Sequence, residues 1–142
     1  MRYILIVLLL ISSYQMVLSR SLDDEKTKFK KVWKLQEMYF DSVAAPVDTT
    51  MQKYRLMLAN DSICYLHDGT QPILCYWNLN TITSSIDLYS EEVMSSQDLF
   101  LKYKIIFINE QNLIVTIDLS NYNSPIKLVE YRLIPDADYV FD

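Results

Sequence analysis

The sequence predicts an all-β domain folded as an eight-stranded antiparallel up-and-down barrel. Short runs of alternating apolar and polar residues recur along the chain, and turn-forming residues such as Asn60-Asp61-Ser62 and Asp68-Gly69 separate them. The connections are too short for the crossover helices that parallel strands require, so neighbouring strands are expected to pair as hairpins. Such a sheet either closes into a barrel or splits into a sandwich. We favour the barrel because closure removes the exposed edges that invite aggregation.

The N-terminus has the pattern of a cleavable export signal over residues 1–19. Arg2 supplies the positive start, Ile4 to Ile11 form a short apolar run, and small residues precede Arg20. The apolar run is well short of the ~20 residues that span a bilayer, so a membrane anchor is disfavoured. We therefore expect cleavage after Ser19 and a secreted or periplasmic protein. The remaining residues, 20–142, have the length of a single domain.

The elements are expected in a simple order along residues 20–142. A capping Ser21, early acids and later lysines favour a short helix or a frayed terminus over residues 21–29. Eight β-rich runs follow, at residues 32–40, 54–59, 63–67, 73–79, 84–89, 101–109, 113–119 and 126–133. In the longer loop 90–100, Ser90-Glu91-Glu92 could cap a helical turn. Residues 135–142 are expected to form a loosely packed tail outside the barrel.

Alternation assigns the side chains of each run to the inside or the outside of the barrel. The residues expected to point inward are Trp33, Leu35, Tyr54, Leu56, Leu58, Cys64, Leu66, Cys75, Trp77, Leu79, Ile86, Leu88, Tyr103, Ile105, Phe107, Leu113, Val115, Ile117, Val129, Tyr131 and Leu133. The residues expected to point outward are Arg55, Lys102, Lys104, Thr116, Asp118, Glu130 and Arg132.

Composition excludes several classes of function. The formal net charge of −5 argues against binding to nucleic acids or to anionic membranes. The single glycine, Gly69, excludes phosphate-cradling loops and dinucleotide fingerprints, which need several residues without a Cβ, and no cofactor is predicted. The lysines at 26, 28, 30, 31 and 34 are the only basic cluster, which we interpret as a solvated edge of the first strand.

The two cysteines, Cys64 and Cys75, flank the turn at Asp68-Gly69. A hairpin centred between Gly69 and Thr70 places them directly opposite each other on adjacent strands. Because export leads to an oxidising compartment, we favour a structural disulfide between them, the alternative being two buried reduced thiols. A metal site is disfavoured because two cysteines and the lone His67 fall short of a closed four-ligand shell.

Residues 30–134 resemble the lipocalin-like domains of secreted bacterial proteins. The motifs that carry the resemblance are Trp33-Lys34-Leu35, Leu56 to Asp61, Trp77-Asn78-Leu79, Ile86-Asp87-Leu88, Tyr103 to Ile108, Leu113-Ile114-Val115 and Val129 to Arg132. Where the family usually has a glycine two residues before each tryptophan, this chain has Lys31 and Cys75. The resemblance implies an up-and-down barrel that holds a small apolar ligand at its mouth, without catalysis.

Our leading hypothesis for function is a non-enzymatic binding module whose barrel accepts a small hydrophobic molecule. Aromatic side chains on the inner face would supply an apolar wall with a few hydrogen-bonding groups, although the same residues could simply fill the core. The interior residues proposed to bind are Trp33, Tyr54, Leu56, Trp77, Tyr103, Phe107 and Tyr131. Such a ligand carrier is expected to be a monomer.

The second hypothesis is a protein-interaction or inhibitor module that acts through its outer surface, with a filled barrel. It is based on the apolar residues predicted to face outward, namely Met57, Ile63, Tyr65, Leu74, Tyr76, Ile106 and Ile114. Catalysis ranks third, because the one histidine stands beside a hairpin tip and the carboxylate pairs are adjacent in sequence, where side chains diverge.

Overall fold

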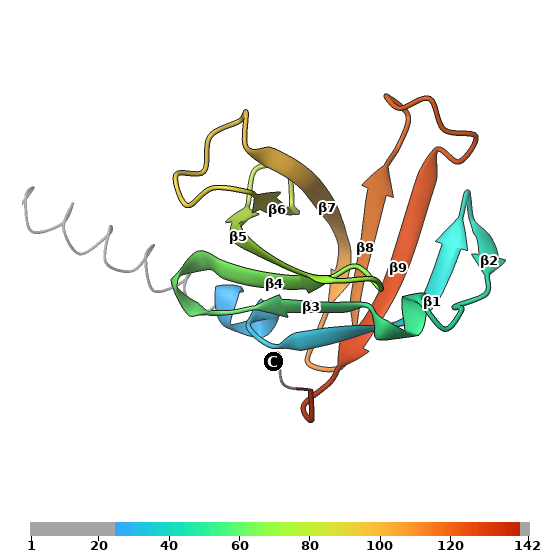
Figure 1. The fold of residues 1–142 in the computed structure, drawn as a ribbon, viewed down its shortest axis with the longest axis horizontal. Coiled ribbons are helices and arrows are strands. Elements are labelled where there is room, and N and C mark those ends of the chain that lie inside the picture. The colour runs from blue at the N-terminus through green and yellow to red at the C-terminus, as the bar shows by residue number, and fades with distance from the viewer. Residues whose placement is uncertain (1–24, 140–142) are drawn as a thin grey trace, which may run out of the picture.

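The computed structural model describes residues 25–139 and confirms a closed, eight-stranded antiparallel barrel (Figure 1). Strands β3 to β9 pair in chain order, and β1 closes the ring by pairing with β3 on one side and β9 on the other. A ninth strand, β2, lies outside this ring and pairs only with the end of β1. The strands are β1 (Val32–Phe40), β2 (Val43–Ala45), β3 (Arg55–Leu58), β4 (Ile63–His67), β5 (Pro72–Asn80), β6 (Ser85–Tyr89), β7 (Leu99–Ile108), β8 (Leu113–Asp118) and β9 (Leu128–Pro135).

The eight expected runs correspond to the eight strands of the ring, and the expected bounds of β1 and β4 match the observed ones. The β2 hairpin is a structural feature that alternation alone does not reveal. Asp41 and Ser42 form its turn with φ of 47° and 70°, which is uncommon for residues with a side chain. The Asp41 carboxylate accepts hydrogen bonds from the backbone N–H groups of Lys127 and Leu128, which ties the hairpin to the start of β9.

The loop between β6 and β7 contains turns and bends but no helical turn, so the helical alternative at Ser90-Glu91-Glu92 is wrong. Hydrogen bonds between residues of the loop hold it in place instead. Ser95 donates from its hydroxyl to the Asp98 carboxylate, and the Ser90 N–H donates to the Asp98 carbonyl at 3.0 Å. These hydrogen bonds satisfy polar groups of the loop without a helical turn.

The core fills the inside of the ring as alternation predicts. Among the fully buried side chains are Trp33, Leu56, Trp77, Tyr103 and Leu133. The inward residues Leu79, Ile105, Ile117 and Tyr131 are partly buried and pack against this core. Of the positions expected outside, Lys102, Lys104, Asp118 and Arg132 are exposed and Arg55 and Glu130 are partly buried. Thr116, also expected outside, is buried, with 7% of its surface exposed. One apolar cluster therefore spans the barrel from β1 to β9.

Phe107 is the one inward prediction that is wrong, because its side chain is 47% exposed. The β7–β8 register shifts between Ile105 and Phe107, which marks a bulge at Ile106. A bulge places two consecutive side chains on the same face of the strand. Ile106 and Phe107 therefore both face outward, and Ile108 returns to pack against the core.

Residues 136–139, the described part of the segment after β9, are held more firmly than the loose tail that the sequence predicts over residues 135–142. The Asp136 carboxylate lies 2.7 Å from the Arg55 guanidinium, and both side chains are largely buried. The Asp136 N–H donates to the Val32 carbonyl at 2.9 Å, and the Tyr139 ring lies 5.0 Å from the Arg55 guanidinium. These contacts fasten the segment across β1 and β3.

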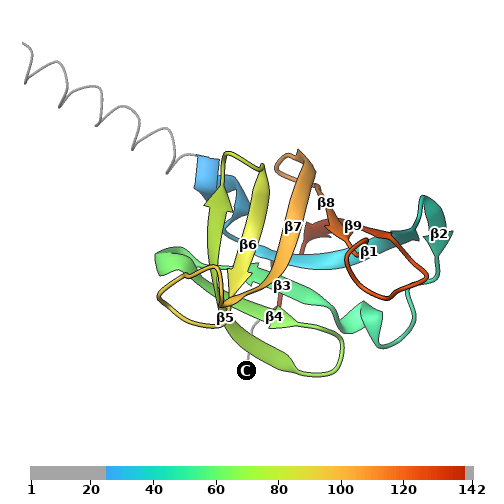
Figure 2. The same ribbon diagram turned by 90° about the horizontal axis from the view of Figure 1, so that it is seen from above.

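Residues 25–29 are helical and lie at one end of the barrel, beside the end of β5 (Figure 2). Phe29 is buried, and its carbonyl accepts a hydrogen bond of 3.0 Å from the Trp33 indole. Lys26 and Lys31 lie over the rings of Trp77 and Trp33 respectively. The basic cluster is therefore not simply a solvated strand edge, since part of it covers the aromatic core at this end.

Candidate functional site

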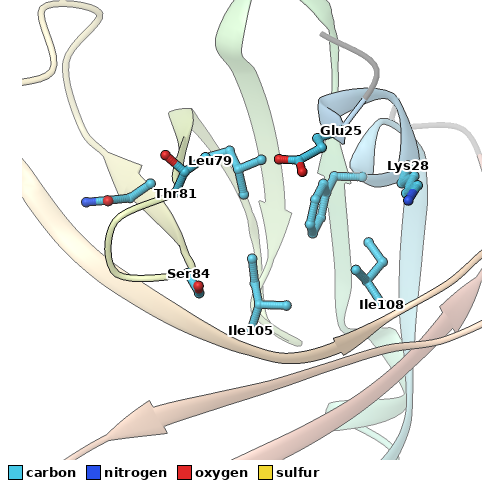
Figure 3. Close-up of a pocket in the computed structure, with 9 residues that line it drawn as sticks. Glu25, Lys28, Leu79, Thr81, Ser84, Ile105 and Ile108 are labelled. Atoms are coloured by element: carbon cyan, nitrogen blue, oxygen red, sulfur yellow. The ribbon is translucent and has the colours of Figure 1, made fainter. Parts of the chain in front are cut away.

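A pocket of about 350 Å³ lies at this end of the barrel, between the helix and the ends of β5 and β7, and we call it the mouth pocket (Figure 3). Its apolar part is made by Phe29, Leu79, Ile105 and Ile108. Figure 3 shows Ile105 and Ile108 pointing into the space opposite Leu79. The volume falls within the range of small-molecule sites, and an apolar pocket with a few polar groups is their usual chemistry.

The side chains sit in the mouth pocket because of where their strands end. Leu79 is the last inward residue of β5, and Ile105 and Ile108 flank the bulge near the end of β7. The turn after β5 is fixed by Asn80, whose amide oxygen accepts from the N–H groups of Ile82 and Thr83. Strand ends of this kind leave inward side chains at the rim, where the ring of neighbours is incomplete.

The polar rim of the mouth pocket carries one acid, one base and two hydroxyls. Glu25 and Lys28 come from the helix, and Thr81 and Ser84 come from the turn between β5 and β6. The amide of Asn80 is also at the rim, but it already binds its own turn and Asp87. The opposite charges of Glu25 and Lys28 leave the rim close to neutral, so it favours an uncharged polar group over an ion.

The predicted interior site is occupied by its own side chains. Trp33, Tyr54, Leu56, Trp77 and Tyr103 are brought together inside the ring, each 3% exposed or less. The indole N–H of Trp77 donates to the Ala59 carbonyl at 3.0 Å, as that of Trp33 does to Phe29. Both indole donors are therefore engaged by the backbone, and these residues act as core rather than as a wall open to a ligand.

Two tyrosines meet at the centre of the barrel. The hydroxyls of Tyr54 and Tyr103 lie 2.5 Å apart, and both side chains are buried. The Tyr131 ring stands edge-on to that of Tyr54, with 5.3 Å between the ring centroids. Burial raises the pKa of Tyr54 and that of Tyr103 far above the ordinary value of tyrosine, so both phenols stay protonated.

The cysteines confirm the predicted register but not the predicted disulfide. Cys64 and Cys75 are directly opposite in the β4–β5 ladder, and both are buried free thiols. Residues opposite each other on adjacent strands can reach the geometry of a disulfide, but here the two sulfur atoms are not bonded. Burial raises the pKa of the Cys64 thiol well above its ordinary value, and a hydrogen bond with Cys75 adds to this. The expectation of a disulfide is therefore corrected to a buried thiol pair.

The apolar residues predicted to face outward do so. Met57, Tyr65 and Leu74 lie side by side in register on β3, β4 and β5, and Ile63 and Tyr76 form a second row. Leu74 is 54% exposed, and the other four are half-buried. We call these residues the outer row; two of the residue types in it, Tyr and Met, are enriched at protein interfaces.

Residues 25–139 contain no group of three or more His, Cys, Asp or Glu side chains placed to hold a metal ion. No helix within this range is long and apolar enough to cross a membrane. Comparison with protein-family models, with curated proteins and with solved structures finds no match. The resemblance to lipocalin-like domains therefore stays a prediction, as do the export signal and the cleavage after Ser19, which lie outside the described residues.

Sequence reasoning did not find the mouth pocket, although two signals pointed toward it. Phe29 is the only large apolar residue between Asp23 and Lys31, a pattern typical of a short helix docked through one side chain. Leu79 and Ile105 were expected inside, and their place near strand ends could have marked them as rim residues. Ile108 was hidden because the bulge reverses the alternation ahead of it.

Proposed function

We propose that this chain is an exported, non-enzymatic binding protein that takes a small uncharged amphipathic molecule in the mouth pocket. One observation carries the proposal: an apolar pocket of about 350 Å³ lies at the end of a barrel whose interior is already filled. For this reason we place the ligand at the rim and not inside the barrel, where the leading hypothesis from the sequence placed it. The apolar part of the molecule would contact Ile105 and Ile108, and its polar head would face Thr81 and Ser84.

The near-neutral rim supports a hydroxyl or carbonyl head over a carboxylate. A carboxylate attracted to Lys28 would also face Glu25, so the two contributions oppose each other. The hydroxyls of Thr81 and Ser84 both donate and accept hydrogen bonds, which suits an uncharged head. Decanol and decanoate are therefore suitable probes, because both have ten carbon atoms and they differ in the charge of the head group.

Calorimetric titration with decanol and decanoate tests the proposal. Decanol should bind at least as tightly as decanoate, and Ile105→Trp, which fills the pocket, should lower the affinity for decanol by about tenfold or more. Ile106→Trp is the matched control, because the neighbouring side chain faces outward and should leave binding unchanged. Thermal unfolding of both variants verifies that they fold. Equal decanol binding by the two folded variants would refute a site at the mouth.

A second candidate, protein recognition through the outside of the barrel, is favoured by the outer row on β3, β4 and β5. Its residues lie in register across three strands, so they form one continuous surface rather than scattered positions. Cross-linking in the medium or periplasm of the natural source tests it. Leu74→Asp should remove a cross-linked partner, and Val93→Asp, on an exposed loop, should not. Capture that is insensitive to Leu74→Asp would argue against this surface.

A further inference from the structure

Strands β7 and β8 pair over only part of their length. Their ladder runs from Ile108 and Leu113 to Lys104 and Thr116 and then stops. Beyond that point β7 continues to Leu99 paired only with β6, and β8 continues to Asp118 paired only with β9. Figure 1 shows the two strands diverging above their paired ends. The barrel wall therefore contains two neighbouring strand segments that are not paired with each other.

The backbone groups of these segments point toward each other. The Ile105 N–H donates to the Ser84 carbonyl on the β6 side, so Lys104 and Lys102, one and three positions earlier, direct their backbone groups toward β8. On the other strand the Leu119 N–H donates to the Lys127 carbonyl on the β9 side, so Asp118 directs its groups toward β7. Lys102 and Asp118 thus present backbone donors and acceptors that the β7–β8 ladder does not use.

A cleft of about 960 Å³ lies between these two segments, and we call it the β7–β8 cleft. Exposed apolar side chains line it from both sides, namely Phe100, Ile106, Tyr122 and Leu128. Both Lys102 and Asp118, the residues with the unused backbone groups, also line it. The cleft therefore combines strand-edge hydrogen bonding with apolar contact area.

The charge of the β7–β8 cleft favours an acidic occupant. Lys102 and Lys104 project from β7, and the Lys102 ammonium, whose side chain is 45% exposed, forms an ion pair of 3.9 Å with the buried Asp87 carboxylate. Asp118 is the acid on the opposite wall, but its carboxylate accepts hydrogen bonds from the hydroxyl and N–H of Ser120 in its own turn. These bonds lower the pKa of Asp118, so its carboxylate stays ionised, and the charged side chains that line the cleft are two lysines against one aspartate.

We propose that the β7–β8 cleft binds an extended acidic peptide of a partner protein by strand addition. The peptide backbone would pair with Lys102 and Asp118, its acidic side chains would approach the two lysines, and its apolar side chains would contact Phe100 and Ile106. Strand addition obtains affinity from main-chain hydrogen bonds and specificity from alternate side chains, which matches the two properties of this cleft. The site is separate from the mouth pocket and does not depend on a ligand there.

Nuclear magnetic resonance titration of the isotopically labelled protein, purified from an exporting host, tests this proposal with three peptides. The probe is the acetylated and amidated hexapeptide of alternating Glu and Val. A Lys–Val hexapeptide reverses its charge, and a Glu–Val hexapeptide with alternate N-methyl groups keeps the side chains but removes backbone donors. The Glu–Val peptide should bind about tenfold tighter than either control. For the N-methylated peptide, the loss of two hydrogen bonds lowers the affinity by about this factor.

Site and charge are tested in the same titration. Binding should protect the amides of Lys102 and Asp118 from hydrogen exchange. Lys104→Gln should weaken binding, and Lys28→Gln, at the mouth pocket, should not. The proposal is overturned by equal binding of the N-methylated peptide, by no binding up to about 1 mM, or by displacement of the peptide with decanol. Protection of Lys102 in a dimer without peptide would also overturn it in favour of a second copy.

Discussion

At the scale of single residues, the few polar atoms inside the barrel all have hydrogen-bond partners within the protein. The indole N–H groups of Trp33 and Trp77 donate to backbone carbonyls, and the hydroxyls of Tyr54 and Tyr103 bond to each other. None of the buried side-chain nitrogen or oxygen atoms among residues 25–139 lacks a hydrogen-bond partner. A core with this property gains nothing from a polar ligand, which is why we place binding at the rim.

The tyrosine pair should contribute measurably to stability. Tyr54→Phe leaves the Tyr103 hydroxyl buried without its partner, so each single variant should lose about 1–3 kcal/mol of unfolding free energy. The double variant should lose less than the sum, because the second change removes the orphaned group. Urea unfolding measures all three, with Tyr122→Phe on the exposed loop as the control. Additive losses would show that the two hydroxyls do not act as a pair.

The thiols of Cys64 and Cys75 should react slowly in the folded protein. Burial excludes the reagent, and the raised pKa of Cys64 keeps it protonated at pH 8, whereas the thiolate is the reactive form. A thiol reagent should therefore modify both cysteines only after denaturant is added. Absence of reactive thiols in the denatured, unreduced protein would instead indicate the disulfide.

At the scale of elements, the hairpins are specified by individual turn residues. Gly69 has φ of 102°, and a Cβ at this position would lie 2.7 Å from the Thr50 carbonyl oxygen. The neighbouring Asp68 carboxylate accepts hydrogen bonds from the hydroxyl and N–H of Thr70 and from the N–H of Gln71. The β4–β5 turn is therefore fixed by one residue that must lack a side chain and one that must carry an acceptor.

Gly69→Ala should destabilise the barrel by about 1–3 kcal/mol, because alanine at this φ is strained and its methyl group would meet Thr50. Thermal or urea unfolding measures the loss. Gln71→Ala, on the exposed side of the same turn, is the control and should cost much less. A neutral Gly69→Ala would mean that the turn does not adopt this geometry.

Asp68 should make stability depend on pH in the acid range. Its hydrogen bonds, first of all that from the Thr70 hydroxyl, lower its pKa to about 2. Since a lowered pKa favours the folded state only while the group is ionised, the contribution is complete above about pH 4. It should disappear as the pH falls toward 2. The stability difference between the wild type and Asp68→Asn should shrink over this interval, and a difference independent of pH would contradict the assignment.

The elements also show how far sequence reasoning extends. Alternation found all eight strands of the ring and placed the side chains correctly where the ladders are regular. It placed Phe107 on the wrong face, because a bulge follows from the pairing of two strands and leaves no signature in either one. The same limit hid the β2 hairpin, whose strand is only Val43–Ala45.

At the scale of the whole molecule, the proposed function rests on the closure of the ring and on the burial of the side chains inside it. The β1–β9 ladder extends from Trp33 to Phe40, so no long edge remains on that side. Closure was predictable from the short loops, whereas the pockets were not. They arise where strands end or diverge, at Leu79 and Ile108 for the mouth and at Lys102 and Asp118 for the cleft.

A nuclear Overhauser spectrum of the protein saturated with decanol tests the central claim, that the interior is filled and the ligand lies at the mouth. We expect cross-peaks from the decanol chain to the methyl groups of Leu79, Ile105 and Ile108. Cross-peaks to Leu56, Leu88 or Val115, which are fully buried inside the ring, would instead show that the barrel is hollow and holds the ligand.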